Sequence, residues 1–310
     1  MSASPSARAS WMLVAVTFLW GMSFSLTHAW QKAPENTADP LVSGLTLIGL
    51  RMPLALAVLA AWQPRVVFGV SRGEFAGGFL LGALFFAGFA LQTWGLASTT
   101  PALSAFFTSV SSAWVPLLCW FAFREPPRLL TLAGLGVGLV GCAVLVEGWN
   151  LRFGDWLTLV ASILFAAELI LLDRVGRRMN PAHLSTGFFV AVGALGLLGA
   201  VIAASAGDGV AAWAGRVGDM LAVPRLAWSV VALATLPTAV AFHWMNSYQP
   251  LVPTSRAALI YLLEAVFSSL FSVLLGYDPL TWALILGGTL IIVGNVLVEV
   301  PGWLNAGATR

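Results

Sequence analysis

The sequence predicts an all-α membrane protein with ten transmembrane helices, arranged as two inverted five-helix repeats around a central cavity. Composition is the first observation behind this prediction. Only 9% of the 310 residues are Asp, Glu, Lys or Arg, and 59% are hydrophobic, whereas about 25% of a soluble domain is charged. The other two observations are ten apolar runs along the chain and a likeness between its two halves. A lipid bilayer is therefore the expected surrounding of this chain.

Each apolar run is bounded by charged residues or by Pro and Gly, and about 20 apolar residues are enough to cross the hydrocarbon core. The first run is longer than the apolar part of an export signal, and no small-residue cleavage site follows it, so we expect it to be retained. The ten expected helices are Ser10–Trp30, Leu41–Trp62, Gly73–Gln92, Ala102–Phe123, Leu129–Glu147, Asp155–Asp173, Ala182–Ser205, Leu226–Tyr248, Ser255–Leu275 and Leu280–Glu299.

The positions of the cations predict the orientation of the chain, because cytoplasmic loops carry an excess of Lys and Arg. With the N-terminus inside, the outer segments hold four cations, Lys32, Arg152, Arg216 and Arg225, and Arg51 lies within a span. The cytoplasmic segments hold ten: Arg8, Arg65, Arg72, Arg124, Arg128, Arg174, Arg177, Arg178, Arg256 and Arg310. Both termini are therefore expected in the cytoplasm, and a bacterial inner membrane is the expected location.

The two halves, residues 1–150 and 151–310, resemble each other. The sequence AVLVE at 143–147 returns as NVLVE at 295–299, and Trp11 and Trp20 align with Trp156 and Phe165. Five crossings are an odd number, so the second half must enter the membrane from the opposite face. Inverted repeats are typical of secondary transporters, because two equivalent halves can open a central site to either side in turn.

Small residues and prolines predict local features of the helices. Gly78 with Gly82, and Gly134 with Gly138, have the spacing that lets membrane helices approach closely. Prolines lie inside three expected spans and should bend or interrupt them, at Pro53, Pro116 and Pro237. The longest outer loop contains GVAAWAGRVGDML, which could form a short helix on the membrane surface or a plain loop.

Several short motifs make the chain similar to the drug/metabolite transporter superfamily, and within it to the ten-helix EamA-type exporters. They are WGMSF at 20–24, Arg51, FREP at 123–126, GDW at 154–156 and TSRAALIYLLEAVF at 254–267. The resemblance covers nearly the whole chain and extends to bacterial exporters of aromatic and other neutral amino acids. It implies that helices 1, 3, 4, 6, 8 and 9 surround a cavity, with helices 2, 5, 7 and 10 outside. Family members carry Glu-Pro where this chain has Glu264-Ala265, and Ser112 stands at the corresponding place in the first half.

Ionisable side chains within the spans are candidates for transport, because each costs at least about 2.5 kcal/mol to place in the bilayer. Glu264 and Tyr261 lie on one face of helix 9, where they could bind the ammonium group of a substrate; alternatively, Glu264 pairs with Arg51 or Arg256. Glu264 could also carry a proton, and Glu168 could carry a proton or be buried against another helix. The remaining proton-coupling candidate is His243, whose alternative is a plain hydrogen bond.

Arg51 is expected to anchor the structure, because the resemblance puts its helix outside the cavity. Aromatic side chains on the helices assigned to the cavity suit an apolar or aromatic substrate, and a few polar groups would orient it. Lipid-facing or core packing is the alternative for each of them. Besides Tyr261 and Glu264, the expected substrate-binding residues are Trp20, Phe24, Phe86, Phe106, Ser109 and Phe165.

The sequence thus predicts a secondary active or facilitative exporter of small metabolites, amino acids first among them, which works by alternating access. Exporters of drugs or other amphipathic metabolites, a channel and an intramembrane enzyme are the alternatives. An enzyme is not expected, because the three histidines are far apart and no hydrolase or metalloprotease motif is present. We expect no cofactor, no metal and no nucleic acid partner, with protons as an optional partner and a monomer as the working unit.

Overall fold

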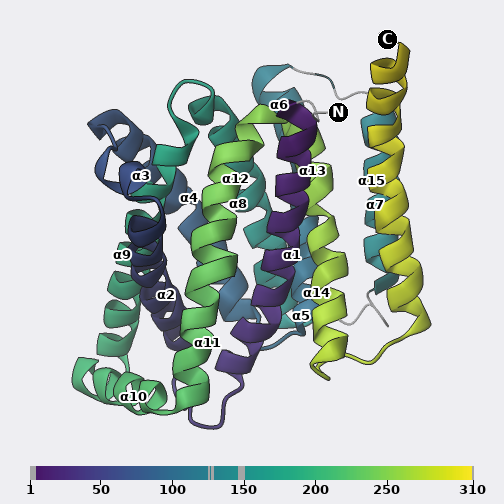
Figure 1. Cartoon of the computed structure of the whole chain (residues 1–310). Coiled ribbons are helices and arrows are strands. Elements are labelled where there is room, and N and C mark those ends of the chain that lie inside the picture. The colour runs from purple at the N-terminus through teal and green to yellow at the C-terminus, as the bar shows by residue number, and fades with distance from the viewer. Residues whose placement is uncertain (1–4, 125, 127–128, 146–150, 309–310) are drawn as a thin grey trace.

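The computed structural model describes residues 5–124, 126, 129–145 and 151–308, and these form a bundle of helices (Figure 1). The first half contains α1 (Pro5–Gln31), α2 (Pro40–Trp62), α3 (Pro64–Phe68), α4 (Arg72–Gly95), α5 (Pro101–Ser109), α6 (Ser111–Phe123) and α7 (Leu129–Leu145). The second half contains α8 (Phe153–Gly176), α9 (Pro181–Ala206), α10 (Val210–Ala222), α11 (Pro224–Ala234), η2 (Thr235–Val240), α12 (Ala241–Tyr248), η3 (Gln249–Leu251), α13 (Thr254–Tyr261), α14 (Leu263–Leu274) and α15 (Trp282–Ala308).

Within the described residues, eight helical segments are long and apolar enough to cross a membrane, so the protein is a multi-pass membrane protein. The fifth and tenth expected spans correspond to α7 and α15, whose apolar parts among the described residues, Leu132–Val144 and Trp282–Gly294, are shorter. The number of ten transmembrane helices therefore stays a prediction. Glu147, Arg128 and Arg310 lie outside the described residues.

The helices form a central group with one pair on either side (Figure 1). At one edge α7 packs along α15, and at the other edge α2 packs along α9. Between these pairs lie α1, α4, α5, α6, α8 and the helices from α11 to α14. This is the division into inner and outer helices that the resemblance implies, and it leaves the inner helices free to enclose a site.

Glycines set the distances between several helices, as the sequence predicts. A Cβ added to Gly82 on α4 would lie 2.6 Å from the Phe188 carbonyl oxygen of α9. A Cβ added to Gly294 on α15 would lie 2.5 Å from the Gly134 carbonyl oxygen of α7. Because lipid tails are as apolar as the side chains, close backbone packing of this kind, rather than hydrophobic burial, holds membrane helices together.

Two of the helical segments that are long enough to cross the membrane are interrupted at positions where no proline stands. The break between α5 and α6 lies at Val110, and the break between α13 and α14 lies at Leu262. At both breaks the backbone forms a hydrogen bond between residues three positions apart, which is a tighter turn than that of an α-helix. Val110 N–H donates to the Phe107 carbonyl (3.3 Å), and Leu262 N–H donates to the Leu259 carbonyl (3.1 Å). The two halves thus share a broken helix at corresponding places.

The three intrahelical prolines behave differently from one another. Pro237 lies in the π-helical segment η2, which separates α11 from α12, and π-helical turns often occur at functional sites. The helices α2 and α6 continue past Pro53 and Pro116, so neither proline interrupts its helix, and a bend at either of them stays a prediction.

The long loop between the sixth and seventh long apolar helices folds as the helix α10, which decides between the two expected forms of that loop. It lies at the end of the bundle opposite both termini (Figure 1), and the indole N–H of Trp213 donates to Thr46 Oγ1 of α2 (2.8 Å). At the same end Arg225 pairs with Glu35 (2.5 Å). The backbone amide of Glu35 itself and the Arg225 guanidinium hold the pKa of the Glu35 carboxyl below its ordinary value.

Candidate functional site

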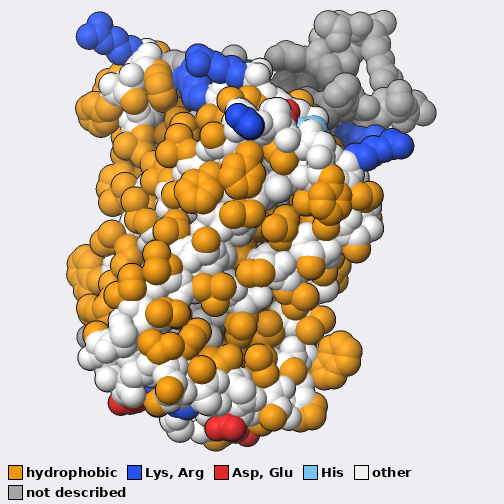
Figure 2. All heavy atoms as spheres, turned by 90° about the vertical axis from the view of Figure 1, so that its left-hand side faces the viewer, with side chains coloured by type: hydrophobic (Ala, Val, Ile, Leu, Met, Phe, Trp, Pro, Cys, Tyr) orange, Lys and Arg blue, Asp and Glu red, His pale blue; other side chains and the backbone are white. Residues whose placement is uncertain are grey.

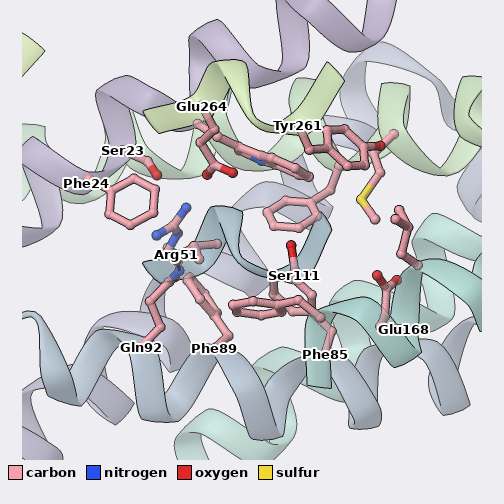
Figure 3. A pocket seen from close by; sticks show the side chains of 16 residues that line it. Ser23, Phe24, Arg51, Phe85, Phe89, Gln92, Ser111, Glu168, Tyr261 and Glu264 are labelled. Carbon is pink, nitrogen blue, oxygen red and sulfur yellow. Dashed lines mark hydrogen bonds between the residues drawn. The ribbon is translucent and has the colours of Figure 1, made fainter. Parts of the chain in front are cut away.

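A pocket with about 620 Å³ of empty volume, part of it continuous with solvent, lies among the inner helices (Figure 3). Its walls come from nine helices of both halves, near the middle of the bundle. Its lining consists of Trp20, Ser23, Phe24, Arg51, Phe85, Phe89, Gln92, Thr108, Ser111, Phe165, Glu168, Leu169, Phe242, Met245, Tyr261 and Glu264. The pocket therefore combines a guanidinium, two carboxylates and a set of aromatic rings.

Arg51 reaches the pocket from α2 and is 2% exposed. Its Nε and Nη2 donate to Thr238 Oγ1 of η2 (2.9 and 2.7 Å), and its guanidinium carbon lies 5.2 Å from the centre of the Phe89 ring. Thr238 Oγ1 in turn donates to the Leu233 carbonyl (2.5 Å). Within the described residues no ion pair joins Arg51 to a carboxylate. A buried cation that is held by a neutral hydroxyl is well suited to bind an anionic group.

Glu264 lies at the same end of the pocket as Arg51. Figure 3 shows the Glu264 carboxylate and the Arg51 guanidinium pointing into one space, beside Ser23. Glu264 is 7% exposed and forms no hydrogen bond with any other residue that the structure describes. Of the two alternatives for Glu264, a structural pair with Arg51 is therefore absent from the described part. We call Arg51, Glu264, Ser23 and Gln92 the Glu264 end of the pocket.

The opposite end of the pocket holds the second carboxylate, Glu168 of α8, together with Tyr261 of α13 (Figure 3). Glu168 is 1% exposed. Its Oε1, the Tyr261 hydroxyl and the indole nitrogen of Trp20 are all buried, and none has a hydrogen-bond partner within the described parts of the chain. We call Glu168 and Tyr261 the Glu168 end.

A row of aromatic rings separates the two ends. Trp20 of α1 lies 5.1 Å from Phe242 of α12, measured between ring centroids, and Phe242 lies 5.0 Å from Phe85 of α4. Phe85 then lies 5.2 Å from Phe165 of α8. Offset and edge-on pairs at these distances are favourable. The row gives the pocket an apolar middle with polar groups on either side.

A smaller hollow continues from the Glu264 end toward the end of the bundle where α10 lies. It shares Ser23, Phe24, Phe89 and Gln92 with the main pocket, and Thr27, Thr93 and Leu96 complete it. Within the described residues, no three His, Cys, Asp or Glu side chains are grouped in a way that could hold a metal ion. The polar chemistry of the pocket is therefore that of charge pairing and hydrogen bonding.

Six of the residues that the sequence singles out line the pocket. Five of them are expected substrate-binding residues, and Glu168 is an expected proton carrier. They come from α1, α8, α13 and α14, and they are Trp20, Phe24, Phe165, Glu168, Tyr261 and Glu264. Their roles in binding or coupling stay predictions, but the fold brings them together around one space.

The structure places four expected residues away from the pocket. Phe86 follows Phe85, and one residue turns the side chain by about 100° around a helix. Phe106 packs on Phe107 (4.5 Å between ring centroids) in a separate core cluster. Ser109 donates to the Ala105 carbonyl of its own helix (2.9 Å). His243 is 7% exposed, with Nδ1 3.4 Å from Ser185 Oγ of α9.

The sequence does not predict a binding role for the other lining residues. It predicts that Arg51 anchors the structure, because its helix is peripheral, but a long side chain can reach inward from an outer helix. Phe85, Phe89 and Gln92 form a stripe along α4, which helical periodicity could have revealed. Ser23, Thr108, Ser111, Leu169, Phe242 and Met245 line the pocket as well.

These helices and this pocket define a multi-pass membrane protein with an internal site for a small molecule. The chain belongs to the EamA-like transporter family, whose model matches it twice, at residues 7–147 and 152–300. The family thus points to a transporter, with a small molecule as its substrate.

Two further similarities extend over most of the chain. A protein of Archaeoglobus fulgidus described as an uncharacterized transporter is 25% identical over 287 residues, which are 93% of this chain and 84% of that protein. A solved crystal structure shares the fold with a TM-score of 0.71 and 20% identity, and the match covers 95% of this chain and 98% of the other.

Proposed function

We propose that this protein exports small metabolites, and above all aromatic and other neutral amino acids, from the cytoplasm. The observation that carries the proposal is the pocket itself, which presents a guanidinium and a carboxylate at one end and aromatic rings behind them. An amino acid has the same layout, because its carboxylate and ammonium groups sit on one carbon and its side chain extends away from them.

The Glu264 end would bind the charged groups of the amino acid. Arg51 has a planar fork of N–H donors that suits a carboxylate, and Glu264 can accept hydrogen bonds from the ammonium group. Ser23 and Gln92 line the same end and can orient the substrate. The hydroxyl of Tyr261 lies at the opposite end of the pocket, beside Glu168 (Figure 3), so it would contact the far end of the substrate rather than the ammonium group at Glu264.

The aromatic row would accept the side chain. Trp20, Phe85 and Phe165 offer flat apolar surfaces, and Phe24 closes the space beside Arg51 (Figure 3). Binding sites for small molecules are mostly apolar, with a few polar groups that fix the orientation. Amphipathic drugs are a second candidate substrate class, because they could bind to the same rings with fewer polar contacts to Arg51 and Glu264.

Alternating access would move the substrate across the membrane, with residues 1–150 and 151–310 as two inverted halves that rock around the pocket. The substrate gradient alone could drive export, or a proton could return in exchange. Glu264 and Glu168 are the better proton carriers, because both face the pocket. His243 of α12 lies outside the pocket and faces Ser185 of α9, so it would act only through movement of these two helices.

The orientation in a bacterial inner membrane would place both termini in the cytoplasm, with the protein working as a monomer. The distribution of charge supports this: on the face that Figure 2 shows, most of the Lys and Arg side chains lie at the upper end, and most of the Asp and Glu side chains lie at the lower end, where basic side chains are visible as well. The upper end is also the end at which α1 begins and α15 finishes (Figure 1). Cations prefer the cytoplasmic side.

Counterflow in proteoliposomes tests the proposal. Purified protein is reconstituted into vesicles loaded with unlabelled phenylalanine, and the entry of labelled phenylalanine is measured against protein-free vesicles. We expect entry above this background and its loss in Arg51→Gln. The exposed Arg225→Gln serves as the control for the loss of an arginine. Flux of a lipophilic dye without flux of any amino acid would favour the drug exporter instead.

A further inference from the structure

The carboxylate of Glu168 has no role in binding an amino acid by its charged groups. Arg51 and Glu264 already offer one positive and one negative partner at the opposite end of the pocket. Glu168 is 1% exposed, and its Oε1 has no hydrogen-bond partner among the described residues. A buried carboxylate is costly unless something compensates it, so a proton or a cationic occupant of the pocket must supply that compensation.

The internal repeat shows that packing does not require a carboxylate at this place. Trp20, Ser23 and Phe24 line the pocket from α1. Since Trp20 aligns with Phe165, Ser23 aligns with Glu168 and Phe24 with Leu169, and all three of these α8 positions line the pocket too. Where the first half presents a hydroxyl, the second half presents a carboxylate, so the charge is specific to one end.

The groups around Glu168 suit a cation. The Tyr261 hydroxyl is buried without a hydrogen-bond partner in the described part of the chain, and it can accept a hydrogen bond. The ring of Trp20 lies 5.6 Å from the Tyr261 ring, between centroids. Aromatic faces attract ammonium groups, and the attraction grows where water is excluded. Among the residues that the structure describes, no Lys or Arg side chain lines this end of the pocket.

We propose that the Glu168 end is a second binding subsite, which takes a protonated amine at the far end of the transported molecule. The substrate class then includes amino acids with a terminal side-chain amine, such as lysine. The methylene groups of such a side chain would cross the aromatic row, while its two ends meet carboxylates. This inference rests on the proposed function, because it assumes that the amino-acid end of the substrate lies at Arg51 and Glu264.

The test compares lysine with norleucine, which has the same side chain without the amine, in counterflow with the wild-type protein. One charge-assisted hydrogen bond is expected to lower the half-saturation concentration for lysine about tenfold relative to norleucine. Glu168→Gln should remove this preference. Asp173→Asn, which alters another buried carboxylate of the same helix outside the pocket, should keep it.

Phenylalanine counterflow separates this inference from the proposed function. If phenylalanine and norleucine are carried but lysine is not preferred, the second subsite is overturned and the exporter stands. If Glu168→Gln folds, by its elution from a size-exclusion column, and leaves the lysine preference intact, the subsite is likewise overturned. If the wild-type protein carries no amino acid at all, the proposed function is contradicted, and the second subsite that rests on it is contradicted as well.

Discussion

The side chain of Arg51 connects a helix at the edge of the bundle with the middle of the pocket. Its two hydrogen bonds go to one hydroxyl, Thr238 Oγ1, in the π-helical segment. A guanidinium needs partners when it is buried, because the cost of desolvating a charge is large. Thr238 therefore fixes the position of the cation without neutralising it, and the guanidinium can still bind an anion.

Replacing this hydroxyl should destabilise the protein. We expect Thr238→Val to lower stability by about 1.5–3 kcal/mol, the range for a hydrogen bond to a charged group. The reason is that Arg51 then stays buried without its acceptor. Thr238→Ser keeps the hydroxyl and should restore most of the loss. Thermal unfolding of the detergent-solubilised protein measures both variants, and equal melting temperatures for valine and threonine would contradict this view of Arg51.

The carboxylate of Glu264 should control flux and its response to pH. We expect Glu264→Gln to lower phenylalanine counterflow about tenfold or more, since it removes a charged partner of the ammonium group. We also expect the variant to lose the part of the wild-type pH dependence that comes from this carboxyl, because an amide does not titrate, and any dependence that remains is assigned to Glu168. Counterflow across a series of buffers measures this. Asp208→Asn, at an exposed carboxylate, should behave as the wild type at every pH.

At the scale of single residues, the sequence identifies side chains with suitable chemistry but not the direction in which they point. Glu264, Glu168 and Tyr261 stand out because polar groups are rare in apolar spans, and all three line the pocket. Phe85 and Phe86 are equally apolar neighbours, and only Phe85 faces inward. The rotation of α4 decides between them, and that rotation depends on what packs on its other side.

The helix α4 is held in that rotation by glycine contacts with α9. Gly78 and Gly82 lie one turn apart and face the backbone of α9. Their spacing in the sequence indicates a close contact, but the partner helix follows only from the fold. The broken helices are less predictable still, because the interruptions at Val110 and Leu262 have no proline to mark them.

A methyl group at the α4–α9 contact should separate the helices. A Cβ on Gly82 would lie 2.6 Å from a carbonyl oxygen and 2.9 Å from the Ala191 Cβ. We expect Gly82→Ala to cost about 1–3 kcal/mol, as overpacking does elsewhere. Gly136→Ala is the matched control, because nothing lies within 4 Å of a Cβ there, and it should be neutral or mildly stabilising. Thermal unfolding compares the two, and an equal loss in both would contradict this account.

For the molecule as a whole, the distribution of charge and the positions of the termini go together. Arg65 follows α2 in the loop that contains α3, at the end of the bundle where α1 begins (Figure 1). Asp208 lies between α9 and α10, at the other end. The proposed orientation therefore puts Arg65 in the cytoplasm and Asp208 outside.

Cysteine labelling in spheroplasts tests this orientation. The two native cysteines, Cys119 and Cys142, are first replaced by alanine. A membrane-impermeant maleimide should then modify Asp208→Cys in intact spheroplasts, and Arg65→Cys only after the membrane is permeabilised. The reverse pattern would place both termini outside the cytoplasm and contradict the proposed orientation. Modification of both from outside would contradict the proposed crossing of the membrane.

The sequence alone determined that this chain is helical, that it is embedded in a lipid bilayer and that it resembles one transporter family. It also located the apolar segments and the rare polar groups within them. These properties are local: hydropathy, charge and short motifs do not depend on which segment packs on which. The tertiary structure decided that Arg51 enters the pocket, that His243 stays outside it and that the two carboxylates lie at opposite ends. Those outcomes depend on the rotation and contacts of whole helices, which arise only when distant parts of the chain pack together.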